Sequence, residues 1–169
     1  MGNRPPETEG SLEHFFAGEF AHSLDEKGRL AIPAKFRPRF KEGAVVTRWM
    51  GECLAIFPAG EWEAMQAEIR KRPRTDRTVN DFVHFVVSGA HETEPDAQGR
   101  IVVPSHLRQF AGLSGEAQVI GATRWLEIWE PSRWRARSWP SSPSKSSSTV
   151  GGTASRPAAG RRSSRSARP

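Results

Sequence analysis

The chain has 169 residues, with 25 Lys and Arg against 19 Asp and Glu, one cysteine, six Trp and nine Phe. This length allows one domain with a substantial core or two very small domains, and a single cysteine excludes an internal disulfide framework. No apolar run approaches the roughly 20 residues of a membrane-spanning helix, and the first residues lack the apolar segment of a secretory signal. We therefore expect a cytoplasmic protein that contacts no membrane.

The net charge of +6 is concentrated at the C-terminal end of the sequence. Residues 138–169 contain six basic residues and no acidic ones, whereas residues 1–137 carry equal numbers of both signs. An inference of nucleic-acid binding must therefore rest on the local arrangement of basic residues and not on the overall charge.

Composition and pattern divide the chain into five segments. Residues 1–14 are polar, and we expect a disordered extension. Residues 19–61 and 90–134 are two similar units, and residues 62–89 between them carry two helical patterns separated by a proline. Residues 135–169, rich in Ser, Pro and Arg, cannot bury enough apolar surface to fold and are predicted to be disordered. We interpret that last segment as an out-of-frame reading of the gene; the alternative is a genuine basic tail that contacts phosphates.

An internal repeat relates residues 25–37 to residues 96–108. Apolar residues occupy the second strand of both copies, and five further residues recur at a constant offset of 71. These are Asp25, Gly28, Arg29, Pro33 and Arg37, which return as Asp96, Gly99, Arg100, Pro104 and Arg108. Five identities at one offset indicate a duplication.

The chemistry of the repeat predicts a hairpin followed by a short helix. Asp25 and Gly28, like Asp96 and Gly99, are turn-forming residues, because Asp accepts backbone N–H bonds and Gly takes the positive φ of a tight turn. The proline that follows suits the first position of a helix.

Two further strands follow in each copy. Residues 44–47 correspond to residues 118–121, and residues 54–57 correspond to residues 126–129. Each copy therefore consists of strand, turn, strand, short helix, strand and strand. A unit of this size rarely folds alone, so we expect an α+β fold, mainly β, in which the copies pack about a pseudo-two-fold axis. The two turns would then lie on one surface.

The sequence predicts no enzyme. The five histidines show no metal-ligand spacing, no glycine-rich phosphate loop is present, and Cys53 lies in an apolar strand that favours a core position. We therefore expect no catalytic residue, metal site, cofactor or small-molecule substrate.

The first turn lies in a locally basic stretch, with six basic and two acidic residues over 25–41. Lys27 and Arg29 on a protruding hairpin would suit phosphate and guanine. Alternatively, Arg29 pairs with Asp25 across the turn; the repeated turn leads us to favour DNA contact. Arg100 occupies the same place in the second copy.

Two further arginines, Arg37 and Arg108, lie on the short helices. They would contact phosphates or pair with acidic residues, and the sequence favours neither reading.

These residues carry a resemblance to a known family. Residues 16–20 (FAGEF), the first turn and residues 32–37 (IPAKFR), together with the second turn, closely resemble the MraZ family of bacterial transcriptional regulators. Residues 88–90 and 126–129 are also similar to it. The resemblance covers residues 15–134.

The resemblance implies two SpoVT-AbrB-type half-domains in a pseudo-two-fold, swapped-hairpin β-barrel with short flanking helices. It also implies a ring-shaped homo-oligomer in the cytoplasm and nucleoid. The expected function is binding to direct repeats in the double-stranded promoter DNA of the division and cell-wall gene cluster, as an autoregulatory repressor. The family's DNA-contacting residues would be Lys27, Arg29 and Arg100. A protein-interaction module, like an antitoxin of the same fold, is the alternative function.

Overall fold

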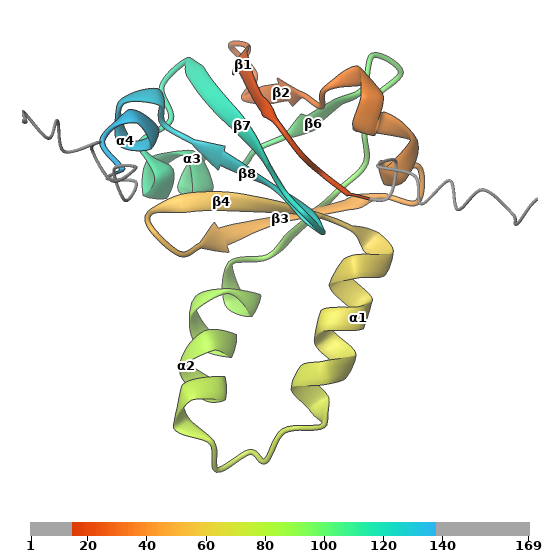
Figure 1. The fold of residues 1–169 in the computed structure, drawn as a ribbon, viewed down its shortest axis with the longest axis vertical. Coiled ribbons are helices and arrows are strands. Elements are labelled where there is room, and N and C mark those ends of the chain that lie inside the picture. Colours follow the sequence, from red (N-terminus) through yellow and green to blue (C-terminus); the bar gives the residue numbers. More distant parts are fainter. Residues whose placement is uncertain (1–14, 138–169) are drawn as a thin grey trace, which may run out of the picture. The chain divides into compact units, whose positions relative to one another are not determined.

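The computed structural model describes residues 15–137, so the prediction for residues 1–14 lies outside the described residues, as does that for residues 135–169 apart from its first three residues. Of these three, Arg135 is the last residue of a short helix. The described chain is α+β and mainly β (Figure 1). Its first half contains β1 (Glu19–Ser23), β2 (Arg29–Ala31), the 3-10 helix η2 (Ala34–Phe40), β3 (Ala44–Trp49), β4 (Cys53–Pro58), α1 (Ala59–Arg70) and α2 (Arg77–Phe85). Its second half contains η3 (Val87–Gly89), β5 (His91–Thr93), β6 (Arg100–Val102), α3 (Ser105–Ala111), β7 (Glu116–Ala122), β8 (Trp125–Trp129) and α4 (Pro131–Arg135).

The strands form two sheets that interleave the two copies. The larger sheet has the order β1-β7-β8-β4-β3-β5, and β2 pairs with β6 in a separate two-stranded sheet. When each strand is exchanged for its counterpart in the other copy, the same two orders result, read from the opposite end. The first strand of each copy pairs with the third strand of the other. The described strands thus have the expected pseudo-two-fold arrangement, in an open sheet and not a closed barrel.

The strand register corrects one sequence correspondence. Phe20 pairs with Val119, and its counterpart His91 pairs with Val46, so Val46 and Val119 are equivalent. The third strands are therefore offset by 73 residues, one fewer than the match of residues 44–47 to 118–121. A slip of one residue moves a side chain to the other face of a strand. The sequence alone does not distinguish the two offsets, because each of them matches two apolar pairs among the four positions of residues 44–47.

The main core lies between the larger sheet and the elements that carry the turns. Leu30 and Ile101, on the inner face of the β2–β6 sheet, are both fully buried. They belong to the same apolar cluster as Phe36 from η2 and Leu107 from α3. The two-stranded sheet is thereby fixed to the body of the protein by its inner face, and its outer face carries Arg29, Ala31, Arg100 and Val102.

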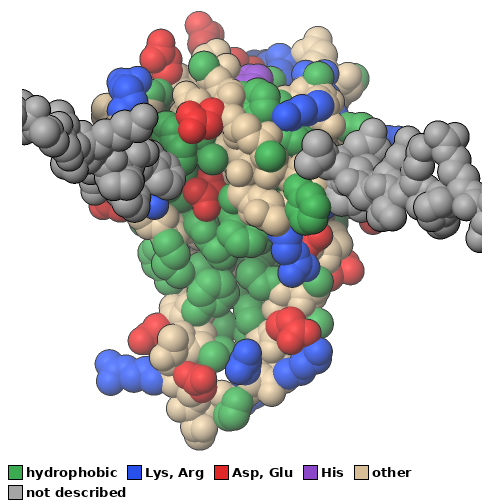
Figure 2. Space-filling model, in the orientation of Figure 1, with side chains coloured by type: hydrophobic (Ala, Val, Ile, Leu, Met, Phe, Trp, Pro, Cys, Tyr) green, Lys and Arg blue, Asp and Glu red, His purple; other side chains and the backbone are tan. Residues whose placement is uncertain are grey.

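The helices of the connector lie on the other side of the sheet. α1 and α2 form where the apolar periodicity predicts helices, with Pro73 between them, and they project together from the sheet (Figure 1). Neither helix has a buried residue. Hydrophobic side chains gather where this hairpin meets the sheet (Figure 2). Trp49 contacts Phe82 of α2 there, with ring centroids 6.0 Å apart.

Candidate nucleic-acid interface

The two Asp-x-x-Gly turns have the same geometry. Asp25 Oδ1 accepts hydrogen bonds from the backbone N–H groups of Lys27 at 3.0 Å and Arg29 at 2.9 Å. In the second copy, Asp96 Oδ1 accepts from the residues at the same two places, both at 2.9 Å. The glycine of each turn has φ +74°, the left-handed region in which glycine avoids the cost of a side chain. Each carboxylate thus builds its own turn through one oxygen.

The second oxygen of each carboxylate, Oδ2, accepts a hydrogen bond from the arginine of the same turn. Arg29 Nε donates to Asp25 Oδ2 at 2.7 Å, and Arg100 Nε donates to Asp96 Oδ2 at 2.8 Å. Because β2 pairs with β6, each arginine also faces the aspartate of the other copy: Arg29 Nη1 lies 3.9 Å from Asp96 Oδ2, and Arg100 Nη1 lies 3.8 Å from Asp25 Oδ2. We call these four residues the turn network. It contains two charges of each sign, and each side chain is about 30% exposed, between 28% and 33%.

The hydrogen bonds lower the pKa values of both aspartates. For Asp96, the backbone N–H and then the side chain of Arg100 hold the pKa at about 2. For Asp25, the backbone N–H of Arg29 is the largest cause of the lowered pKa. Hydrogen bonds to the ionised form stabilise it. Both carboxylates are therefore charged at neutral pH and able to orient a guanidinium.

The side chains of Arg37 and Arg108 each pack against the turn of the other copy. Arg108 Nε donates to Val103 O at 3.1 Å, and a Cβ at Gly28 of the first turn would lie 3.0 Å from its Cζ. Arg37 Nε donates to Ile32 O at 3.0 Å, and its side chain packs in the same way against the glycine of the second turn. The two turns thus need glycine for backbone conformation and for room beside an arginine.

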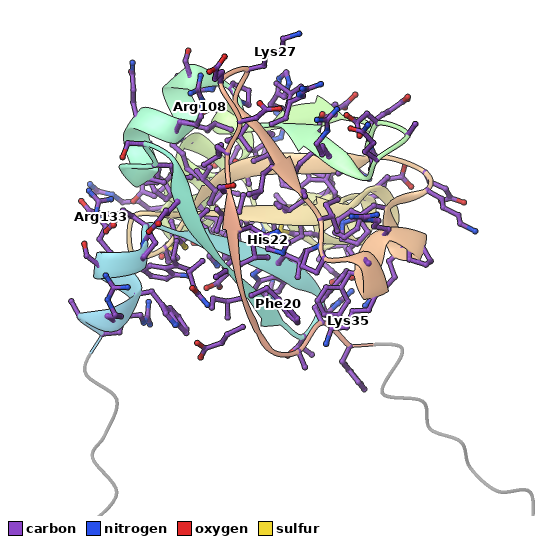
Figure 3. The ribbon with its side chains drawn as sticks, turned by 90° about the horizontal axis from the view of Figure 1, so that it is seen from above. Phe20, His22, Lys27, Lys35, Arg108 and Arg133 are labelled. Carbon is purple, nitrogen blue, oxygen red and sulfur yellow. The ribbon has the colours of Figure 1, made fainter. Side chains whose placement is uncertain are left out.

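Lys27 is the exposed cation at the tip of the first turn. Its side chain extends away from the molecule, with Arg108 close to the same turn (Figure 3). Lys35 lies at the other end of β1, where its Nζ donates to Ala17 O at 3.1 Å and lies 4.7 Å from the centroid of the Phe20 ring. The structure therefore gathers Lys27, Arg29, Arg37, Arg100 and Arg108 around the paired turns and separates Lys35 from them.

Sequence reasoning weighed the Arg29–Asp25 pair but missed the contacts between copies. The cross-pairs to Asp96 and the packing of Arg37 against Gly99 depend on β2 pairing with β6. The constant offset of the repeat, read together with a pseudo-two-fold axis, was the signal that would have predicted them.

Metal-binding clusters, reactive thiols and membrane-spanning helices are further features that the described part of the chain could contain. Residues 15–137 contain no group of three or more His, Cys, Asp and Glu side chains placed to hold a metal ion. Cys53 is fully buried, and burial raises the pKa of its thiol far above its usual range. Among these residues there is also no helix long and apolar enough to span a membrane.

Comparison with known proteins points to one family. The family model described as "MraZ protein, putative antitoxin-like" matches residues 15–84 and 86–148. A protein of Acetivibrio thermocellus named "Transcriptional regulator MraZ" is 42% identical over 123 residues, which cover 73% of this chain and 86% of that protein. Proteins of the same name from Natranaerobius thermophilus and Roseiflexus castenholzii are 43% and 42% identical, over 70% and 71% of this chain and 83% and 84% of their own lengths.

Proposed function

The chain belongs to the MraZ family of transcriptional regulators, and from this premise we propose that it regulates transcription by binding double-stranded DNA in a sequence-specific manner. The observation that carries the proposal is the pairing of β2 with β6, which brings Arg29 and Arg100 together on the outer face of one two-stranded sheet. The major groove, about 12 Å wide, admits a two-stranded β-ribbon, and arginine reads guanine through its O6 and N7 atoms.

The surrounding cations fit phosphate contacts beside such a ribbon. In this proposal, Arg29 and Arg100 contact bases, while Lys27, Arg37 and Arg108 contact phosphates. Phosphate contacts position a protein on the duplex, and base contacts supply the sequence information. The target would be short direct repeats in the promoter of the division and cell-wall gene cluster, with the chain repressing its own gene in the cytoplasm and nucleoid.

Self-assembly is the second part of the proposal. We propose that residues 19–61 and 90–134 are two SpoVT-AbrB-type half-domains with swapped hairpins, joined by a connector over 62–89, and that copies assemble into a ring. The connector supplies apolar surface for this contact: a hollow of about 350 Å³ between α1 and α2 is lined by Met65, Ile69, Val79 and Phe82. Glu68 and Arg72 lie at the same hollow, so its charged groups have both signs and suit a second copy.

The test is a titration of labelled promoter DNA from upstream of the chain's own gene with the full protein. Fluorescence anisotropy should show affinity at least about 1,000-fold above that for a shuffled duplex, the lower end of the usual ratio of specific to non-specific binding. Equal affinity for both duplexes, together with co-purification of a stoichiometric protein partner from the same cells, would instead favour the antitoxin-like interaction module.

A further inference from the structure

The hydrogen bonds of the turn network occupy some of the N–H groups that Arg29 and Arg100 would present to DNA. Among the described residues, the Nε of each network arginine donates to the aspartate of its own turn, at 2.7 Å for Arg29 and 2.8 Å for Arg100. Arg100 Nη2 also lies 2.8 Å from Asp96 Oδ2. Each guanidinium is thus fixed along the edge that carries Nε, and its far end, with Nη1, is turned toward the neighbouring turn.

Fixing a guanidinium along one edge determines where its remaining N–H groups point. A free arginine side chain loses considerable rotamer entropy when it adopts one geometry on a base, whereas an oriented one has lost that entropy on folding. The same carboxylates cancel the positive charge of the arginines, because the turn network is neutral as a whole. Non-specific binding comes almost entirely from positive charge near phosphates. Orientation of the two guanidinium groups should therefore favour specific binding, whereas neutralisation of their charge should weaken non-specific binding.

We propose that Asp25 and Asp96 are positioning residues that give the chain its sequence discrimination: they orient Arg29 and Arg100 for base contact and suppress their attraction for phosphate. The inference rests on the proposed DNA-binding function. It assigns the aspartates a role beyond building the turns, for which one oxygen of each is sufficient. Because each carboxylate lies within 4 Å of both guanidinium groups, the two copies contribute as one unit.

Substitution by asparagine separates the two roles of each aspartate. Asparagine keeps an Oδ1 that accepts the backbone N–H groups of the turn, and it is favoured in such turns. It removes the negative charge and places an NH₂ group, which cannot accept, toward the arginine Nε. The matched control is Glu26→Gln, because Glu26 is exposed in the first turn beside Lys27 and the change removes the same charge.

The experiment measures two affinities for wild type, Asp25→Asn, Asp96→Asn and Glu26→Gln. One probe is a duplex enriched by the wild-type protein from a random-sequence pool, and the other is a shuffled duplex of the same composition. For both Asp variants we expect affinity for the shuffled duplex to rise about twofold or more, the scale of an exposed ion pair. The ratio of specific to shuffled affinity should fall about fivefold or more, the scale of one arginine–guanine contact.

The control separates orientation from net charge. Glu26→Gln should raise both affinities together and leave their ratio within about twofold of wild type. If the Asp variants change the ratio no more than Glu26→Gln does, the aspartates only build the turns and the inference is wrong. If the pool yields no enriched sequence for wild type, the proposed function itself fails. Melting curves confirm folding, and either Asp variant alone suffices if the other unfolds.

Discussion

The two turns share one backbone geometry but differ in the charge around them. Lys27 of the first turn is replaced by Gln98 in the second, and Glu92 and Glu94 lie shortly before the second turn. All four of these side chains are exposed. Glu26 of the first turn is itself replaced by Ala97, so a phosphate backbone that approaches the second turn meets one cation fewer and one additional carboxylate. The first turn is accordingly the stronger half of the proposed interface.

This asymmetry predicts unequal effects of the two arginines. Arg29→Ala should cost about 1–3 kcal/mol of specific binding free energy, and Arg100→Ala should cost less. The measurement is anisotropy with promoter DNA at a fixed salt concentration, on variants whose melting curves show an intact fold. Affinity close to wild type for Arg29→Ala would contradict the assignment of the first turn to base contact.

The turn network also makes stability depend on acid. The folded-state pKa of Asp96 is about 2, below its ordinary value of 3.8, and the pKa of Asp25 is lowered as well. A lowered pKa means that the ionised carboxylate stabilises the fold; this contribution is complete above the ordinary pKa and is lost as the pH falls through the folded-state value.

Asp96→Asn should therefore weaken the pH dependence of the melting temperature between pH 4 and pH 2 relative to wild type, because one of the two linked groups is gone. Thermal melts followed by circular dichroism across this window make the measurement, with Glu26→Gln as the control. Parallel curves for wild type and Asp96→Asn would show that the network contributes nothing to folding.

The sequence predicted the order of the helices and strands and missed part of their geometry. The Asp-x-x-Gly turns, short helices and connector helices form where the turn residues, proline and apolar spacing indicate them. The strands on either side of each turn, however, belong to different sheets instead of pairing with each other as the expected hairpin. The first short helix is a 3-10 helix with Pro38 inside it, whereas its counterpart α3 is an α-helix that ends at Gly112 in the left-handed conformation. Local pattern cannot specify which strand of the other copy pairs with β1, because that choice depends on packing between residues far apart.

The second turn requires glycine at residue 99 because of its positive φ and because Arg37 packs against it. Gly99→Ala should destabilise the fold by about 1–3 kcal/mol, because alanine is strained at φ +74° and Arg37 must also move. Gly60→Ala is the matched control: Gly60 is inside α1 with nothing within 4 Å of its absent Cβ. There alanine should stabilise the helix by up to about 1 kcal/mol. Urea unfolding of both variants checks the opposite signs, and equal effects would refute the account of the turn.

In the proposed assembly, the hollow between α1 and α2 contacts a second copy. Val79 lines the hollow between α1 and α2, and His84 is exposed on the same helix. Val79→Glu should reduce the mass of the assembly, because a carboxylate cannot be buried there without a partner, while His84→Glu should leave it unchanged. Sedimentation velocity on folded protein measures both. If Val79→Glu sediments as wild type does, the ring contact lies elsewhere.

For the whole molecule, the proposed ring implies multivalent binding. With equal numbers of charges of both signs, residues 1–137 of one subunit offer little non-specific attraction for DNA, and useful affinity would come from several subunits on consecutive repeats. Promoter fragments with one, two and three repeats should therefore differ steeply in affinity, by about tenfold or more per repeat. Equal affinity for one repeat and for three would show that each subunit binds alone.

The interleaved strand order also determines when the chain can finish folding during synthesis. β1 pairs with β7, about 100 residues later in the chain. At the usual translation rate of 5–20 residues per second, β1 leaves the ribosome roughly 5–20 s before its partner exists. The nascent first copy therefore waits with β1 unpaired, because Thr123 and Val119, the backbone partners of Phe16 and Phe20, have not yet been synthesised. We expect this interval, and not the finished protein, to be the stage at which the chain most needs a chaperone.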